Sequence, residues 1–304
     1  MRNYIFSLVP VFLLSIFPFA PCTAGGQPKA PDSEKRSSIH QVDGFAYLSE
    51  DKTVSQIRSE AFALAKRQAL EAAQTYIQSK TKVESAKLTY DLIWSEAEGS
   101  VRLLDQKDFG IEKNTRYHVW IKAEVFYDLA PKHTDDTSKP PASGHLTAFI
   151  PGSGPLTVNV WTDKKTYIQG EEVIIYLQGN RDFFAVVVDV MANGDIIQLL
   201  PNTHRTENFF RGGTRYRIPG NKDHFSLAVS EPYGKDTVVV YASESSIDSL
   251  PTHAIGGGLG AFRGTQTDLS EKARGIRIET TGPAQAGQGV EFYEGQWSFS
   301  TVAH

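Results

Sequence analysis

Two apolar runs flank the dipeptide Asn193-Gly194 and give residues 182–202 the clearest hydrophobic pattern in the chain. An Asn-Gly pair between apolar runs is a strong signal for a β-hairpin closed by a two-residue turn. One face of this hairpin is apolar, and the other mixes apolar residues with the facing pair Asp189 and Gln198. The predicted register pairs Ala192 with Asp195, Val190 with Ile197 and Val188 with Leu199. We expect so apolar a hairpin at the centre of a sandwich or barrel.

Around this hairpin, residues 156–249 alternate short apolar stretches with Gly, Pro, Asn and Asp. That spacing predicts an all-β, immunoglobulin-like sandwich. Residues 250–304 contain a glycine-rich loop at 256–264 and two further strand patterns, at 276–280 and 297–302. We expect these C-terminal strands to return to the sandwich, because Trp297 and Phe299 need cover.

Residues 39–128 have a different pattern, which predicts a compact α+β unit. A strand is expected around Gly44, and Thr53 with Gln56 forms a capping box. A long amphipathic helix follows over residues 54–80, with alanines at helical spacing on its apolar face. A second helix is predicted over residues 85–99, through Leu92 and Ile93, and then two strands, from Val101 and over residues 117–125.

Two polar stretches separate these units. Residues 25–38 are interpreted as a disordered tether, and residues 129–155 as a linker rich in Pro, Gly and Ser. Neither stretch has enough apolar surface to fold alone. The predicted organisation is therefore multidomain, an α+β N-terminal domain followed by a β-sandwich.

The first 24 residues have the pattern of a signal peptide. Arg2 precedes an apolar run, and Cys22-Thr23-Ala24 fits a small-x-small site for cleavage after Ala24. A transmembrane anchor is the alternative, but the run is short and interrupted by prolines. Lipidation of Cys22 is a third hypothesis, although Phe19-Ala20-Pro21 fits it poorly. We therefore expect a periplasmic or secreted bacterial protein without a transmembrane span in the mature chain.

Charge and cysteine content narrow the function. The chain has 31 basic and 35 acidic residues, which argues against general nucleic-acid affinity. Cys22 is the single cysteine, so cleavage leaves no disulfide and no cysteine metal site. No two of the eight histidines have zinc-protease spacing. Neither a metal nor a cofactor is expected.

The best candidate site in the sequence is the loop over residues 202–215. It could bind an anionic or carbohydrate ligand, or a partner; the alternative is a long connection held by Phe209 and Phe210. Its side chains combine several hydrogen-bond donors, and the candidate residues are Asn202, His204, Arg205, Asn208, Arg211 and Arg215.

Two other features have competing interpretations. Asp189 is the one carboxylate in an apolar strand, which suggests either a buried acid with a raised pKa or a partly solvated pair with Gln198. We favour the pair. Residues 256–263 resemble a nucleotide loop, but Arg263 stands where the last glycine is needed, so a flexible loop is favoured.

The region from Tyr167 to Ser243 resembles the bacterial domain-of-unknown-function family 4384. The order and spacing of several short motifs carry this resemblance. They are Gly170-Glu171, Asp182-Phe183-Phe184, Asn193-Gly194, Leu199-Leu200-Pro201-Asn202, Asn208 with Gly212, Ile218-Pro219 and Glu231-Pro232-Tyr233-Gly234.

The N-terminal unit is similar to the small α+β domain of some envelope lipoproteins and of the flagellar-assembly protein FlgT. The matching residues are Gly44-Phe45-Ala46, the alanines from Ala61 to Ala73 and Gly99-Ser100-Val101. Neither resemblance implies a catalytic residue. Both imply an envelope protein that binds or scaffolds.

We therefore expect a non-enzymatic envelope protein that binds or scaffolds envelope components through its sandwich. One alternative is a glycan- or peptidoglycan-binding module that uses the 202–215 loop. Another is a hydrolase with dispersed catalytic residues. A pocket with two or more convergent side chains of perturbed pKa would favour the hydrolase.

Overall fold

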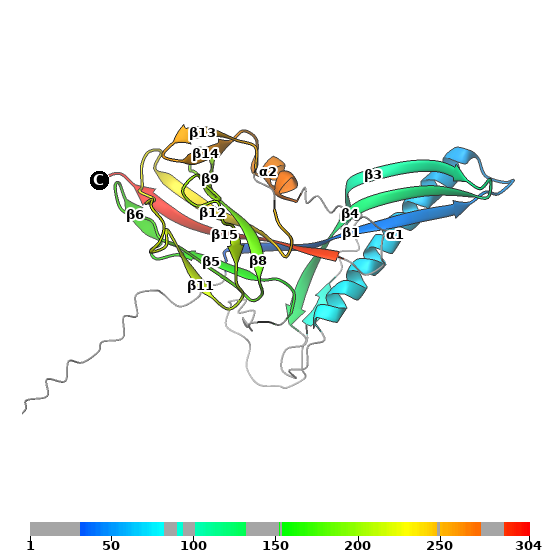
Figure 1. The fold of residues 1–304 in the computed structure, drawn as a ribbon, viewed down its shortest axis with the longest axis horizontal. Coiled ribbons are helices and arrows are strands. Elements are labelled where there is room, and N and C mark those ends of the chain that lie inside the picture. Colours follow the sequence, from blue (N-terminus) through cyan, green and yellow to red (C-terminus); the bar gives the residue numbers. More distant parts are fainter. Residues whose placement is uncertain are drawn as a thin grey trace, which may run out of the picture.

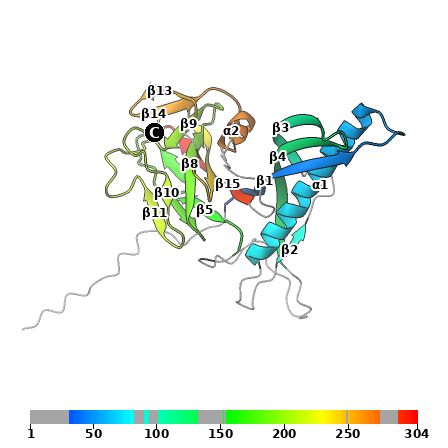
Figure 2. The same cartoon turned by 45° about the vertical axis from the view of Figure 1, so that its right-hand side comes forward.

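The computed structural model describes residues 31–81, 90–93, 101–131, 152, 154–247, 250–274 and 289–304. An N-terminal α+β unit and a C-terminal β-sandwich lie side by side, and one long sheet runs through both (Figures 1 and 2). The predicted fold class is confirmed. The continuity of the sheet between the two units was not predicted.

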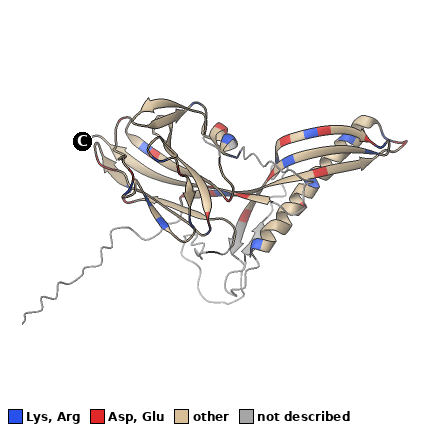
Figure 3. Ribbon diagram, in the orientation of Figure 1, with Lys and Arg blue, Asp and Glu red and all other residues tan. Residues whose placement is uncertain are grey.

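The N-terminal unit is a sheet covered on one face by a helix. Strand β4 is central and pairs with β1 along one edge and with β3 and β2 along the other. Acidic and basic side chains are interspersed along β3 and β4 (Figure 3). The elements are β1 (Ser33–Tyr47), α1 (Val54–Thr81), β2 (Tyr90–Ile93), β3 (Val101–Glu112) and β4 (Arg116–Pro131).

Helix α1 begins and packs as its sequence predicts. The capping box is present, because Thr53 N donates to Gln56 Oε1 at 2.8 Å and Gln56 N donates to Thr53 Oγ1 at 3.3 Å. Four alanines at intervals of four residues are fully buried against the sheet: Ala61, Ala65, Ala69 and Ala73. A Cβ added at Gly44 of β1 would lie 2.3 Å from the Ala61 carbonyl oxygen. Small residues on both sides therefore permit this close contact.

The sandwich is formed by the C-terminal part of the long sheet and a second sheet of three strands. The long sheet runs β13-β14-β9-β8-β12-β15 here, with β10 beside β8 and β6 beside β15, and the second sheet runs β11-β7-β5. The elements are β5 (Val158–Thr162), β6 (Thr166–Ile168), β7 (Ile175–Gly179), β8 (Phe183–Val190), β9 (Ile196–Leu200), β10 (Phe209–Phe210), β11 (Arg215–Ile218), β12 (Gly234–Ser243), β13 (Thr252–Gly256), β14 (Leu259–Phe262), α2 (Gln266–Ala273) and β15 (Gly289–Val302).

The central hairpin, β8–β9, closes with a different turn from the one predicted. Gly194 N donates to the Met191 carbonyl at 2.8 Å, and Met191 N donates to the Asp195 carbonyl at 2.9 Å. The loop therefore has three residues, and Gly194 supplies the left-handed backbone with φ 89°. The predicted register is wrong by one residue. The observed pairs are Val190 with Ile196, Asp189 with Ile197 and Val188 with Gln198, and a bulge then brings Leu200 opposite Val187.

Both faces of β8 are buried. Phe183, Ala185 and Val187 face the core between the two sheets, whereas Val186 and Val188 belong to a second cluster that includes Leu269 of α2. A strand buried on both faces explains why this segment has so few polar residues.

Strand β15 joins the two units. It pairs with β12 of the sandwich through residues 292–301 and with β1 of the N-terminal unit through residues 289–296. The predicted return of the C-terminal strand over residues 297–302 is confirmed. The strand also continues into the N-terminal unit.

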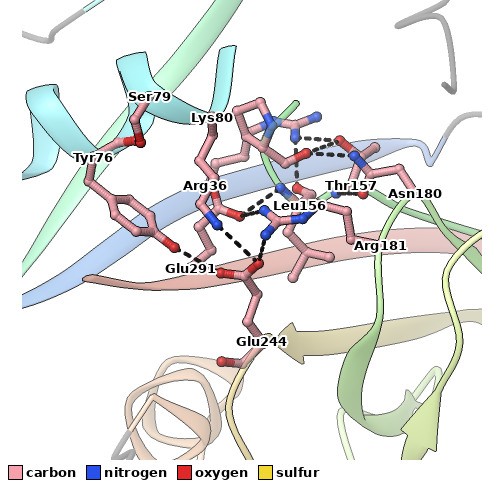
Figure 4. A network of polar contacts seen from close by, with 12 residues as sticks. Arg36, Tyr76, Ser79, Lys80, Leu156, Thr157, Asn180, Arg181, Glu244 and Glu291 are labelled. Carbon is pink, nitrogen blue, oxygen red and sulfur yellow. Dashed lines mark hydrogen bonds and ion pairs between the residues drawn. The ribbon is translucent and has the colours of Figure 1, made fainter. Parts of the chain in front are cut away.

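Buried ion pairs lie on one face of this junction (Figure 4). Glu291 of β15 is fully buried, and its Oε2 accepts hydrogen bonds of 2.9 Å from Leu156 N and from Arg181 Nη1. Arg181 also pairs with Glu244, which accepts a 2.8 Å hydrogen bond from the Tyr76 hydroxyl of α1. Burial, reinforced by Glu244, raises the pKa of Glu291 to about 7.

A second set of ion pairs lies on the opposite face, beside α2. Arg274 is 2% exposed, and its guanidinium lies 2.7 Å from Glu124 Oε1 of β4 and 2.9 Å from Glu294 Oε2 of β15. Ser37 of β1 donates a 2.6 Å hydrogen bond to Glu124. These contacts join β1, β4, β15 and the end of α2, so they hold the two units in one arrangement.

The predicted tether is partly wrong, because residues 33–38 form the first part of β1. The polar side chains of Arg36, Ser37 and Ser38 are buried with partners. Arg36 Nη1 donates to the Leu156 carbonyl at 3.0 Å and to Thr157 Oγ1 at 2.8 Å. Buried polar residues whose partners lie far away in the sequence look like a linker when the sequence is read alone.

Three further predictions are corrected. The second helix is wrong at Leu92 and Ile93, which form β2 and pair with the end of β4. The predicted linker begins too early, since β4 runs to Pro131. The predicted glycine-rich loop at 256–264 contains the turn of the β13–β14 hairpin and strand β14. The signal peptide (1–24), residues 25–30 of the tether, most of the second helix, residues 132–150 of the linker and the strand at 276–280 lie outside the described residues.

The alanine contact between α1 and the sheet predicts the effect of overpacking. Ala65→Leu should lower the free energy of unfolding by about 1–3 kcal/mol, because the added atoms have no space against β1. Ala63→Leu, at an exposed position on the same helix, is the matched control and should change it by less than about 0.5 kcal/mol. Urea unfolding measures both, and equal effects would contradict the packing described.

Candidate functional site

Asn202 of the predicted loop stabilises the turn that follows β9. Its Nδ2 donates to the Leu199 carbonyl at 2.8 Å, and its Oδ1 accepts from the backbone N–H groups of His204 and Arg205, both at 2.8 Å. The side chain is 9% exposed. Its hydrogen-bonding groups are therefore used within the turn itself.

His204 and Arg205 contact neighbouring loops. His204 Nε2 lies 3.2 Å from the Gly257 carbonyl, and its ring stacks on Phe225 with 6.0 Å between centroids. Arg205 Nη1 lies 3.2 Å from Asp223 Oδ2. Both side chains therefore tie the loop to adjacent segments.

The other three candidates lie farther along the loop. Asn208 Nδ2 lies 3.5 Å from the Ile247 carbonyl. Arg211 is exposed, and its backbone N–H donates to the Tyr216 hydroxyl at 2.8 Å. Arg215 at the start of β11 is exposed, and its guanidinium lies 5.6 Å from the Trp161 ring centroid. The contacts of the six candidates thus involve several separate segments, and a ligand site in this loop stays a prediction.

A pocket of about 760 Å³ lies elsewhere in the sandwich, and none of the six loop candidates lines it. Its volume is in the range of small-molecule sites. Strands β8, β9, β12 and β15, the segment 226–232 and the β13–β14 hairpin form its walls. Its main apolar lining residues are Val173, Ile175, Ile197, Leu199, Val238 and Phe299, and its charged or titratable ones are Asp189, Asp195, Glu231, Asp236, His253 and Arg263.

Two aspartates enter this pocket from neighbouring strands. Asp189 of β8 lies opposite Val238 of β12, and Asp236 is two residues from Val238 on the same strand. Because alternate residues of a strand share a face, both carboxylates point to the same side of the sheet. The pairing of β8 with β12 therefore brings two acids, far apart in the sequence, into one apolar pocket.

Asp189 is not compensated by a partner. It pairs with Ile197 across β9 instead of the predicted Gln198, whose Nε2 donates to the Pro201 carbonyl at 2.6 Å. Asp189 Oδ1 is buried and lacks a hydrogen-bond partner among the described residues. Burial, and secondarily the charge of Asp236, raises the pKa of Asp189 to about 8. The favoured pairing of Asp189 with Gln198 is therefore wrong, and Asp189 is a partly exposed acid with a raised pKa whose Oδ1 is buried.

Asp236 is 5% exposed but has partners. Its Oδ1 accepts a 2.9 Å hydrogen bond from Ala192 N in the hairpin loop, and its Oδ2 lies 3.3 Å from Thr301 Oγ1. Burial raises its pKa, and these two hydrogen bonds act in the opposite direction. Asp236 thus holds the hairpin loop through hydrogen bonds, whereas Asp189 Oδ1 has no hydrogen-bond partner among the described residues.

The segment 226–232 forms a wall because backbone hydrogen bonds fix it. Val173 N donates to the Leu227 carbonyl at 2.7 Å, and Val229 N donates to the Glu171 carbonyl at 3.0 Å. The exposed side chains around the opening carry both signs of charge, from Asp195, Glu231 and Arg263. The pocket is therefore acidic inside and mixed at its rim.

Sequence reasoning singled out Asp189 but missed Asp236. A carboxylate two residues before the apolar stretch Val238–Val240 looks like the polar start of a strand. Only the pairing of β8 with β12 shows that the two acids are neighbours. The hairpin register, which was off by one residue, concealed that Asp189 lacks a partner.

In the part of the chain that the structure describes, no three His, Cys, Asp or Glu side chains are grouped as metal ligands would be. Over those same residues, no helix has the length and hydrophobicity needed to cross a bilayer.

Comparison with known proteins gives one family match, which lies in the sandwich. Residues 166–246 match the model of a family described as "Domain of unknown function (DUF4384)". The predicted resemblance to this family is confirmed. Neither a curated protein nor a solved structure matches the chain. The matched region contains Asp189, Asp236 and segment 226–232, and the remaining pocket wall comes from β13, β14 and β15 outside it.

The buried, unpartnered acid predicts a specific pH dependence of stability. The folded state keeps a proton on Asp189 up to about pH 8, whereas the unfolded state releases it near pH 4. The wild-type protein should therefore lose stability relative to Asp189→Asn as the pH rises from 4 to 8. We expect the variant to be nearly equal in stability to the wild type at pH 4 and more stable at pH 9, by about 1.4 kcal/mol for each unit by which the pKa of Asp189 is raised.

Urea unfolding from pH 4 to 9 tests this expectation. Asp51→Asn, at an exposed position before α1, is the matched control and should give a difference independent of pH. A wild-type protein that gains stability over Asp189→Asn as the pH rises would show that Asp189 is paired.

Proposed function

We propose that this chain is a non-enzymatic envelope protein that binds a ligand or partner through its β-sandwich. The pocket is the single observation that carries the proposal. It is preformed and mostly apolar, and it contains an acid, Asp189, whose Oδ1 has no hydrogen-bond partner among the described residues. An uncompensated polar group in a folded protein costs stability, so a ligand that pairs with it is a physical reason for its presence.

The envelope location is supported by the sequence. Residues 1–24 have the composition of an export signal, and cleavage after Ala24 would leave a chain without cysteine. The similarity of the N-terminal unit to domains of envelope lipoproteins and FlgT also favours this location. Periplasmic location, with Cys22 as a less favoured lipid anchor, is therefore part of the proposal.

The scaffolding role is supported by the junction. Strand β15 and the two sets of buried ion pairs leave little freedom for one unit to rotate against the other. A partner bound to the sandwich would then be held at a set orientation to the N-terminal unit. Such a protein would act as a spacer between two envelope components.

Glycan binding through the 202–215 loop is the alternative for the ligand class. Arg211 and Arg215 are the exposed cations of this loop, and Arg215 lies over Trp161. Retention on peptidoglycan, lost in an Arg211→Ala/Arg215→Ala variant, would favour this alternative over the pocket.

Hydrolysis is a second candidate function, favoured by one observation. Asp189 and Asp236 share a pocket, and the pKa of each is raised. A protonated acid beside a second carboxyl group is an arrangement used in general acid–base catalysis. We favour binding, because Asp236 is engaged by Ala192 and Thr301 and so is held in a structural role.

Photocrosslinking in intact cells tests the binding proposal. A photoreactive amino acid replaces Ile255, which is 49% exposed and lines the pocket, and in the control it replaces Leu64, which is 37% exposed on α1. We expect a defined adduct in the envelope fraction from position 255 and none from position 64. The same purified protein is then assayed on a panel of hydrolase substrates.

Equal labelling at both positions, or none, would count against the pocket as the binding site. Turnover of a substrate that is lost in both Asp189→Asn and Asp236→Asn would replace binding by hydrolysis.

A further inference from the structure

The interior of the pocket selects for one sign of charge. Its inner ionisable groups, Asp189 and Asp236, are both acids, whereas the basic side chains that line it, His253 and Arg263, are exposed at the rim. A carboxylate accepts hydrogen bonds and attracts cations, and in an apolar surrounding this preference is strong. An anionic ligand would meet two acids inside and is disfavoured.

The walls around the two acids are apolar, so they favour a ligand with a hydrocarbon part. Val238, Ile197 and Phe299 line the pocket beside Asp189 and Asp236, from β12, β9 and β15. A ligand that fills this space therefore needs an apolar body and a cationic end. Such amphipathic molecules bury their stem along apolar surface and keep their charge on a polar partner.

We propose that the pocket binds an aliphatic cation, a primary ammonium or guanidinium group on a hydrocarbon stem, with Asp189 as its counter-ion. This inference rests on the proposed function and names the ligand class of the same pocket. The cationic end donates to the carboxylate of Asp189, which lines the pocket and whose Oδ1 has no partner among the described residues, and the stem lies along the apolar walls. A free amine and a Lys or Arg side chain of a partner protein share this chemistry.

Binding of a cation should be coupled to loss of a proton. Without ligand, Asp189 holds its proton up to about pH 8, and a bound cation favours the ionised carboxylate. The titratable and charged groups that line the pocket together with Asp189 are Asp236 inside and, at the rim, Asp195, Glu231, His253 and Arg263. Between pH 5 and 8 affinity should therefore rise, by up to about tenfold per pH unit, with one proton released per ligand.

Calorimetric titration of the full mature chain provides the test. The probes are n-hexylammonium, 1-hexanol and hexanoate, which share a stem and differ in charge. We expect n-hexylammonium to bind at least tenfold more tightly than the other two. That preference should be lost in Asp189→Asn and kept in Asp51→Asn. Titration at pH 6.5 in buffers of different ionisation enthalpy should show the release of about one proton.

The source of the cation is resolved by a further probe, Nα-acetyl-lysine methylamide. Binding of this probe as tight as that of n-hexylammonium would indicate a partner's side chain, and binding of n-hexylammonium alone would indicate a free amine. Both results keep the proposal.

Three results would overturn it. The first is binding of 1-hexanol as tight as that of n-hexylammonium, and the second is tighter binding of hexanoate. The third is an affinity for n-hexylammonium that falls as the pH rises, which would mean that protonated Asp189 donates to a neutral acceptor. If one of these results accompanied a specific crosslink from position 255, the proposed ligand class would be wrong, but the proposal that the sandwich binds a ligand or partner would be kept. Loss of that crosslink as well would remove the binding function itself.

Discussion

The architecture depends on burying charge where β15 passes from the sandwich into the N-terminal unit. Glu291 and Glu294 lie on opposite faces of this strand and are both almost fully buried. A buried carboxylate is tolerated only with a partner, and the partners here come from distant elements: Arg181 precedes β8, and Arg274 follows α2. Arg274 also pairs with Glu124 of β4, and this ion pair forms only when both units are in place.

The carboxylate of Asp189 in the pocket is accommodated in a different way from Glu291 and Glu294. Asp189 lies in the same long sheet, but no arginine of the described residues forms an ion pair with it, and burial raises its pKa so that it retains a proton. Natural proteins keep such costly groups where a function requires them. The contrast between Glu291, which Arg181 accompanies, and Asp189, which remains unpartnered, is the main reason to place the function in the pocket.

Sequence patterns were sufficient to predict the elements that are stabilised by contacts between residues close together in the sequence. The capping box of Thr53 and the alanine spacing predicted α1, and Asn193-Gly194 predicted the hairpin, although its three-residue loop moved the register. These patterns failed where the structure of a segment depends on contacts with residues far away in the sequence. Arg36 looked like part of a tether because its partners lie some 120 residues away, and Leu92 became a strand through pairing with β4. The acid pair in the pocket likewise exists only after β8 and β12 meet.

Native-state hydrogen exchange tests the central claim, that a shared β15 and its ion pairs make the two units one cooperative body. The most protected amides of α1 and β4 and those of β8 and β12 should exchange with the same free energy of opening and the same dependence on urea. A markedly lower free energy for α1 and β4 than for β8 and β12 would show that the N-terminal unit unfolds by itself and would contradict this claim.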